Sequence, residues 1–309
     1  MTTRVGSAAV VWLAAALALV AAALFALASA VQQRSAAAVP DEHARGLRLF
    51  RSLLRSRRWW TGNLADTGGY VAQAAALGLG SLLLVQPLLV TTVLFALPLG
   101  ARWAGRRLTR SDWAWAGVLT LSLAAFVATG RPTAGDELAG WRAWLPAWLV
   151  LGVVVTCCLL GAAVRRGTTR AVLLAVTTGV AYGLAAAMTK GVVSLLDDGP
   201  AAVLGHWSTY LLAAALLGGT LVQQSAFQAA SLGASLPAAT VAEPVVAVAL
   251  GITVLGERLR AGGAEWSLIG VLVAAMAAAT VALARSSAAA AARGRRVAPP
   301  APAGVDRGG

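Results

Sequence analysis

Apolar residues occur along most of this chain in runs of about 20, separated by short stretches rich in arginine and glycine. A helical run of that length crosses a hydrocarbon core of roughly 30 Å. The stretch 59–101 is too long for one crossing, and Gly78, Gly80 and Ser81 predict a tight turn inside it. We therefore predict an all-α polytopic membrane protein with nine transmembrane helices, at 8–30, 59–79, 81–101, 113–130, 144–164, 171–193, 207–229, 236–256 and 266–284.

Basic residues between these runs predict the orientation of the chain. With the N-terminus outside, 19 of the 25 Lys and Arg residues fall in loops on the cytoplasmic side, among them seven arginines within 31–58. Cytoplasmic loops carry an excess of such residues and lie against an anionic leaflet. We therefore predict an N-out, C-in protein of the cytoplasmic (inner) membrane. The segment 41–58 fits either a basic interfacial helix or a solvated loop.

A set of features recurs about 155 residues later in the chain. Matching elements of the two copies are Gln73 and Gln228, Gln86-Pro87 and Glu243-Pro244, Arg107-Leu108 and Arg258-Leu259, Trp113 and Trp266, and Gly117 and Gly270. Matched spans lie five apart, an odd number, so they cross in opposite directions. The sequence thus predicts an inverted 4+1+4 repeat, the usual plan of a secondary transporter.

The repeat divides the chain into four parts. The first repeat covers 1–130, a linker with the span 144–164 covers 131–170, the second repeat covers 171–284, and 285–309 is predicted to be a disordered cytoplasmic tail. A competing interpretation treats the first span as a signal peptide cleaved after Ala30. Cleavage would remove the partner of the sixth span.

Composition excludes several classes of protein. Only 12% of residues are charged, against roughly a quarter in soluble domains. The net charge of +13 is spread over short clusters between apolar runs, so no nucleic-acid partner is expected. The two cysteines are adjacent, the two histidines have no metal-ligating neighbours, and no phosphate-binding glycine-rich loop occurs. We expect neither an enzyme nor a cofactor.

Polar side chains inside the spans are the candidate site residues, because burying a charge in a bilayer is costly. The candidate lining of a substrate or ion cavity comprises Asn63, Asp66, Tyr70, Gln73, Gln86, Gln224, Gln228 and Glu243. The first four share one helical stripe. Polar residues of this kind also join helices, and Asp66 or Glu243 could simply bond a neighbouring helix. If a cation is bound, these two carboxylates are its candidate ligands.

Lys190 and the two residues that precede prolines lead to further structural expectations. Lys190, at the end of a span, could pair with Glu243, face the cavity or reach the outer interface. Gln86 and Glu243 each precede a proline, which predicts kinks in their spans.

The second copy resembles the drug/metabolite transporter superfamily, in its EamA-like group. The residues that carry the resemblance are Glu243-Pro244, Leu255-Gly256-Glu257-Arg258-Leu259, Trp266 and Gly270. The first copy departs from the pattern, with Arg106 where the second has Glu257. The likeness covers 8–130 and 171–284 and implies an inner-membrane carrier with a central cavity and no ATP site. Glu257 is interpreted first as a turn and packing residue. The nine-span plan is more similar to the NIPA-type magnesium transporters of the same superfamily.

Three functions are therefore considered. The first is a secondary transporter of a small solute by alternating access, with Asp66 and Glu243 handling a proton or a cationic solute. The second is a divalent-cation transporter, most plausibly for magnesium, because hard cations prefer oxygen ligands. The third is a non-transporting membrane scaffold. A homodimer is compatible with each of them.

Overall fold

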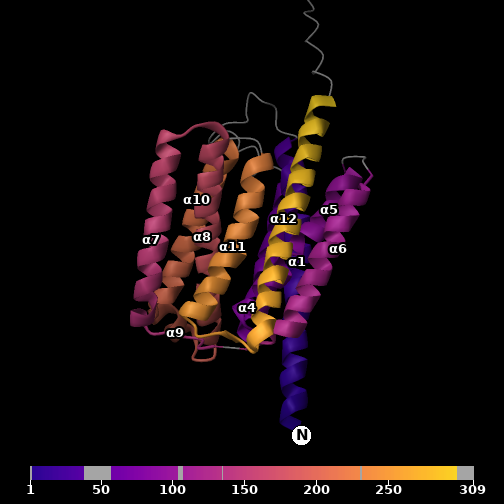
Figure 1. The fold of residues 1–309 in the computed structure, drawn as a ribbon. Coiled ribbons are helices and arrows are strands. Elements are labelled where there is room, and N and C mark those ends of the chain that lie inside the picture. Colours follow the sequence, from indigo (N-terminus) through magenta and orange to yellow (C-terminus); the bar gives the residue numbers. More distant parts are fainter. Residues whose placement is uncertain (1, 38–56, 104–106, 134, 230–231, 298–309) are drawn as a thin grey trace, which may run out of the picture.

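The computed structural model describes residues 2–37, 57–103, 107–133, 135–229 and 232–297, and these are almost entirely helical (Figure 1). The helices are α1 (Thr2–Ala37), α3 (Arg57–Leu79), α4 (Leu82–Leu89), α5 (Thr92–Trp103), α6 (Arg110–Gly130), α7 (Trp141–Val164), α8 (Gly167–Ser194), α9 (Pro200–Gly205), α10 (Trp207–Ala229), α11 (Leu232–Thr253) and α12 (Gly263–Val297). Two short strands, β1 (Pro132–Thr133) and β2 (Arg258–Leu259), pair antiparallel. The fold is an all-α bundle.

Helices occupy each of the nine stretches expected from the sequence. Gly80 and Ser81 make the turn between α3 and α4, and the Ser81 hydroxyl caps α4 by accepting a hydrogen bond from the Leu84 N–H. The stretch 81–101 is broken into α4 and α5 at Val90–Thr91, three residues after Pro87. Proline removes one helical hydrogen bond and so favours such a break. In α11 the helix continues through Pro244.

Exposed apolar side chains show that this bundle belongs in a membrane. Six stretches of the described residues are helical, long and apolar enough to cross one: Ala9–Val31, Leu82–Leu99, Arg110–Gly130, Trp141–Val164, Gly167–Ser194 and Gly263–Ser286. On α7, Leu149 is 72% exposed and Val164 is 79% exposed. Soluble monomers rarely expose such continuous apolar surface. The chain is therefore a polytopic membrane protein.

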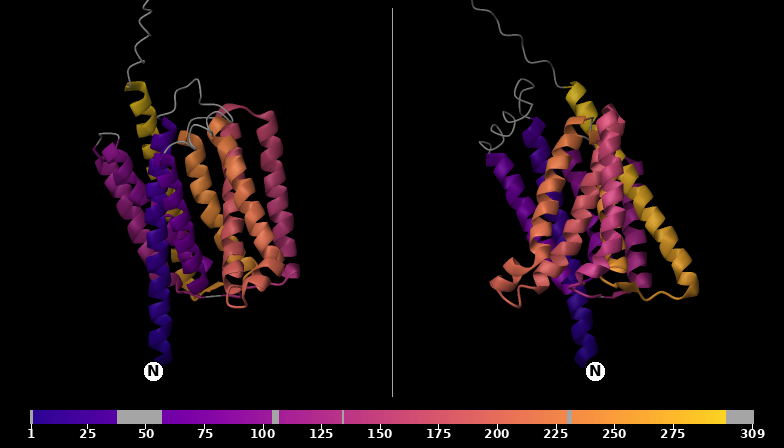
Figure 2. Two further views of the ribbon diagram at one scale, coloured as in Figure 1. Left: turned by 180° about the vertical axis from the view of Figure 1, so that it is seen from behind. Right: turned by 90° about the vertical axis from the view of Figure 1, so that its left-hand side faces the viewer.

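Long-range contacts show how α4, α6, α8 and α11 are directed. Glu257, in the turn after α11, contacts the first residues of α4 and Lys190 near the end of α8. Arg260 donates its backbone N–H to the carbonyl of Gly130, so α6 ends at the same place. We call this the Glu257 end of the bundle; the N-terminus of α1 projects beyond it, and α12 ends on the opposite side (Figure 2).

Helix α1 forms part of the core. Its buried alanines pack against α3, where a Cβ on Gly69 would lie 2.8 Å from the Phe25 ring and one on Gly80 would lie 3.0 Å from Ala14. Small residues allow this close approach of two helices. Helix α1 is thus closely packed against α3 in the bundle.

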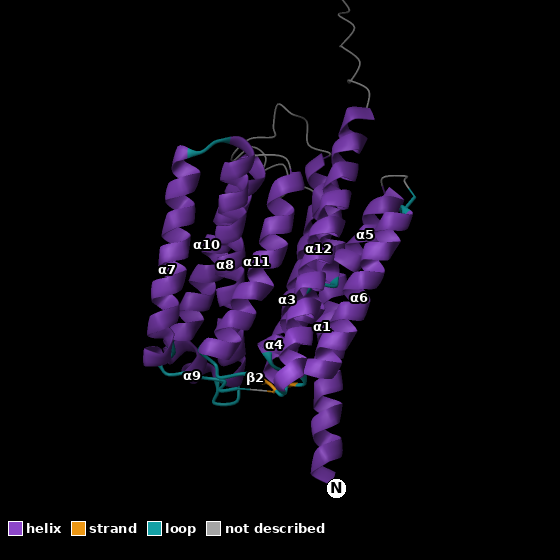
Figure 3. Cartoon of the chain, viewed as in Figure 1, coloured by secondary structure: helices purple, strands orange, loops and turns teal. Residues whose placement is uncertain are grey.

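The C-terminal helix is longer than the sequence led us to expect. The C-terminal segment was expected to be disordered from residue 285, and this is wrong for 285–297, because α12 continues to Val297 (Figure 3). Five consecutive alanines at 288–292 explain the extension, since alanine is the strongest helix former. Residues 298–309 and most of the basic loop 31–58 lie outside the described residues.

Candidate functional site

Helix α8 lies at the centre of the candidate site, because it packs along α10 and α11 and also contacts α3. Gly179 and Gly183, one turn apart, face α11. A Cβ at Gly179 would lie 2.9 Å from the Glu243 backbone nitrogen, and one at Gly183 would lie 2.7 Å from the Glu243 carbonyl oxygen. The two glycines therefore bring α8 against the backbone of Glu243.

Tyr182, which lies between these two glycines in the sequence, projects from α8 toward α10. Its ring lies against Gly219, where a Cβ would come within 2.8 Å. Its hydroxyl donates to Gln223 Oε1 at 3.2 Å and shares a hydrogen bond of 3.1 Å with Thr220 Oγ1. Gly183, the next residue, lies against the Glu243 carbonyl of α11. This turn of α8 thus contacts α10 through Tyr182 and α11 through Gly183.

A second contact joins α3 to α8. The Tyr70 hydroxyl lies 2.7 Å from Thr189 Oγ1, and Thr189 in turn donates to the carbonyl of Ala185 at 2.8 Å. Tyr70 follows Asp66 by four residues, so the two lie on one face of α3. This part of the stripe predicted from the sequence therefore faces α8.

Seven residues from four helices make up what we call the central polar cluster. They are Tyr70 of α3 with Asp66 one turn before it, Tyr182 and Thr189 of α8, Thr220 and Gln223 of α10, and Glu243 of α11, whose backbone lies against Gly179 and Gly183. Asp66 and Thr220 are exposed, whereas Tyr182 and Glu243 are partly buried. The cluster offers two carboxyl groups, hydroxyls and an amide, and none of its members is basic. Such a set suits a proton or a positively charged group.

The remaining predicted residues have different surroundings. Asn63 is partly buried on α3, Gln73 is 5% exposed and Gln86 is 1% exposed within α4. Gln86 Nε2 has no hydrogen-bond partner among the described residues. The backbones of Gln224 and Gln228 lie in α10, but their side chains are outside the described residues. The neighbouring Gln223, which sequence reasoning passed over, supplies the amide that Tyr182 contacts.

Lys190 and Glu257 form a buried ion pair that the sequence did not predict. Lys190 Nζ donates to Glu257 Oε1 at 2.6 Å, and the side chains are 3% and 0% exposed. The predicted pairing of Lys190 with Glu243 is therefore wrong, because its partner is Glu257, and its position relative to the outer interface stays a prediction. The same carboxylate accepts from the backbone N–H groups of Leu82 at 2.9 Å and Leu83 at 3.0 Å. Glu257 is a charged cap on α4 as well as a turn residue.

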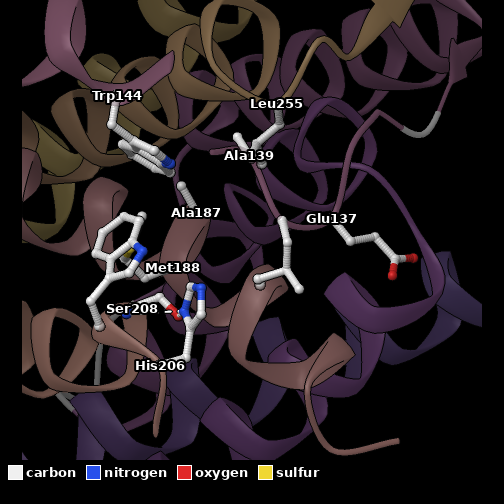
Figure 4. Close-up of a pocket in the computed structure, with 11 residues that line it drawn as sticks. Glu137, Ala139, Trp144, Ala187, Met188, His206, Ser208 and Leu255 are labelled. Atoms are coloured by element: carbon white, nitrogen blue, oxygen red, sulfur yellow. Dashed lines mark hydrogen bonds between the residues drawn. The ribbon is translucent and has the colours of Figure 1, made fainter. Parts of the chain in front are cut away.

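The Glu257 end contains a small pocket (Figure 4). It has a volume of about 10 Å³, room for one water molecule, and its lining includes Trp144, Ala187, Met188, His206 and Leu255. The His206 ring lies 2.7 Å from the Ser208 hydroxyl, and the two side chains face each other in Figure 4. The cavity is too small for a solute.

A larger groove lies on the outside of the bundle, between α7 and α10. It has a volume of about 340 Å³, and its lining consists of Trp141, Leu145, Trp148, Trp207 and Leu211. Trp148 and Trp207 pack edge to face, with centroids 6.4 Å apart. Its wall is apolar and carries no ionisable group, so the central polar cluster remains the candidate site.

Comparison with known proteins places the chain in a family. No family model matches it, and no solved structure matches it. It is 37% identical over 275 residues to an uncharacterized protein of Corynebacterium glutamicum, an alignment that covers 86% of this chain and 95% of the relative. At that identity and coverage, the chain belongs to the same family as the Corynebacterium glutamicum protein.

Proposed function

We propose that the protein is a secondary transporter that moves a small solute by alternating access between two inverted repeats. The observation that carries the proposal is the central polar cluster, where hydroxyls and an amide form hydrogen bonds between α3, α8 and α10. Two carboxyl groups belong to the adjoining turns, Asp66 one turn before Tyr70 on α3 and Glu243 where α11 packs against Gly179 and Gly183. Three of those helices, α8, α10 and α11, belong to the second repeat, and α3 belongs to the first. A solute held there contacts both halves.

Helix directions support the inverted repeat. At the Glu257 end, α3 and α6 end, whereas their repeat partners α10 and α12 begin there. Likewise α4 begins where its partner α11 ends. Each matched pair thus runs antiparallel, which is what an inverted repeat requires.

Matched helix caps add a second line of support. At the start of α6, the Thr109 N–H donates to Asp112 Oδ2 at 2.9 Å. At the start of α12, the Gly262 N–H donates to Glu265 Oε2 at 2.6 Å. Asp112 and Glu265 directly precede the matched residues Trp113 and Trp266, so the repeat extends to the capping hydrogen bonds.

Charge supports the proposed orientation in an inner membrane, with nine spans and the N-terminus outside. Among the arginines whose side chains the structure describes, eight lie in loops and helix ends opposite Glu257: Arg57, Arg102, Arg107, Arg110, Arg165, Arg166, Arg170 and Arg285. The Glu257 end holds four, namely Arg131, Arg142, Arg258 and Arg260. Basic residues favour the cytoplasmic side, so the Glu257 end faces outward.

We further propose membership of the drug/metabolite transporter superfamily, in its EamA-like group. The support is the turn after α11, where Gly256 adopts φ 65° and Glu257 caps α4. The Gly-Glu-Arg-Leu segment thus has a defined place between the two repeats. Glycine suits this position because residues with a side chain rarely adopt positive φ.

The chemistry of the cluster suits a proton, an organic cation or a hydrated magnesium ion. Its two carboxyl groups come from α3 and α11, and the other members offer hydroxyls and an amide. In the described part of the chain no three His, Cys, Asp or Glu side chains come together. Magnesium usually takes one or two carboxylates plus several retained waters. Transport of a proton, an organic cation or magnesium should in each case depend on Asp66 and Glu243.

A binding screen followed by a flux assay tests the proposal. Purified protein is screened for thermal stabilisation by magnesium, amines, amino acids and metabolites, since a ligand that binds the folded state raises the melting temperature. Each hit is then tested for uptake into proteoliposomes with an imposed proton gradient. Asp66→Asn and Glu243→Gln should abolish uptake, and Asp197→Asn, at an exposed acidic residue outside the cluster, should not. Equal uptake in all four proteins contradicts the assignment of the site.

A further inference from the structure

Four segments of the chain meet around the turn that carries Glu257. They are the first turn of α4, the last turns of α8, the turn between α11 and β2, and the loop that follows β1. In that loop the Asp136 N–H donates to the Leu255 carbonyl at 2.7 Å, and a Cβ on Gly135 would lie 2.0 Å from the same oxygen. The loop after β1 therefore packs tightly over the turn that carries Glu257.

Glu257 joins the two repeats through charge rather than through apolar packing alone. Its carboxylate accepts from Leu82 and Leu83 of the first repeat and from Lys190 of the second. The N-terminus of α4 also favours an anion through its helix dipole. Because the carboxylate and the ammonium are both enclosed, neither is stable there without the other.

A buried pair of this kind has two favourable arrangements. In the first the charges are in contact in a dry interface, and in the second both are hydrated after the interface has opened. A half-open arrangement would leave one charge desolvated and unpaired, which is costly. Elements with two discrete arrangements are what alternating access needs.

We propose that Lys190, Glu257 and the N-terminus of α4 form the outer gate of the bundle, closed in this structure. The small cavity lined by Met188 and Gly191, on either side of Lys190 in the chain, has a volume of about 10 Å³ and is too small to hold a solute. Opening requires α4 and Lys190 to separate from the turn carrying Glu257, so that water reaches both charges. This inference rests on the proposed function only in assigning the gate to transport.

Thiol labelling measures gate opening without any transported solute. Cys157 and Cys158 are replaced by alanine, and Met188→Cys, at a position 2% exposed in the wall of the small cavity, serves as the reporter. A membrane-impermeant maleimide is added to the outer side of right-side-out vesicles. Lys190→Met and Glu257→Gln should each raise the labelling rate at least about tenfold, because they remove half of a buried pair.

A second reporter separates opening from unfolding. Thr178→Cys replaces a residue that is 0% exposed. It lies on the same helix as Met188, ten residues earlier and farther from the gate. Gate opening raises labelling at position 188 alone, whereas unfolding raises it at both positions. Met188→Cys labelling that stays unchanged in both gate variants overturns the proposal.

If both gate variants unfold, the Gly251→Ala variant tests the gate instead. A Cβ there would lie 2.8 Å from Glu257 Oε2 and 3.0 Å from Leu83 Cδ1, so it presses on the gate while keeping both charges. Faster labelling at position 188 alone supports the gate, and labelling equal to that of Gly270→Ala, whose Cβ meets nothing within 4 Å, contradicts it. Uptake by wild-type proteoliposomes reports separately on the transport proposal.

Discussion

Replacing the two members of the buried ion pair one at a time should destabilise the fold unequally. Glu257→Ala leaves three donors without their acceptor, namely the Lys190 ammonium and the N–H groups of Leu82 and Leu83. Lys190→Met leaves the Glu257 carboxylate its two N–H donors at the start of α4. The structure therefore makes Glu257 the more costly member to lose.

The magnitude follows from the hydrogen bonds each variant removes. Breaking a buried pair costs about 3–5 kcal/mol, and a hydrogen bond to a charged group is worth about 1.5–3 kcal/mol. We expect Glu257→Ala to lower the free energy of unfolding by about 5 kcal/mol and Lys190→Met by about 3 kcal/mol. The double variant should cost less than the sum of the two single variants, because the residues interact directly.

Unfolding of purified protein in mixed detergent micelles, titrated with sodium dodecyl sulfate, measures these differences. Asp197→Ala, at an exposed carboxylate, is the control and should stay within about 0.5 kcal/mol of the wild type. The reasoning is refuted if Lys190→Met destabilises the protein as much as Glu257→Ala, or if the two effects add without coupling.

Three further predictions concern the framework of the site. Gly183→Ala places a Cβ 2.7 Å from the backbone of α11 and should lower the free energy of unfolding by about 1–3 kcal/mol. Gly218→Ala, whose Cβ meets nothing within 4 Å, should not destabilise the protein. Thermal unfolding of both variants measures the difference. Thr109→Ala removes the cap of α6 and should cost about 1 kcal/mol by the same measurement, and no loss of stability would contradict the capping role. Because α1 packs in the core, intact-mass spectrometry should find a chain that retains it, and a mature N-terminus at Val31 would contradict the nine-span plan.

The positions of the helices could be predicted from the sequence, because a bilayer demands about 20 apolar residues in each span. The break between α4 and α5 was also foreseeable as a kink at Pro87, since proline acts on its own helix. These features depend on local composition. The end of α12 was misplaced because its alanines were grouped with the proline and glycine residues that follow them.

The partners of polar side chains were harder to predict. Lys190 and Glu257 are separated by 67 residues, and no periodic pattern connects them. Glu257 was interpreted as a turn residue because it follows Gly256 at the end of a span, although an acidic residue so near an apolar run could have prompted a search for a basic partner. Tyr182 was not singled out from the sequence, although a tyrosine hydroxyl inside an apolar span is a polar group that needs a partner.

An untargeted flux experiment tests the central claim most directly. Proteoliposomes are loaded with a mixture of amines, amino acids and other metabolites, and mass spectrometry follows which compounds reach the medium. The account predicts that at least one compound leaves wild-type vesicles faster than vesicles with the Asp66→Asn/Glu243→Gln double variant, reconstituted at equal density. Identical efflux of every compound from the two preparations would contradict transport through the central polar cluster.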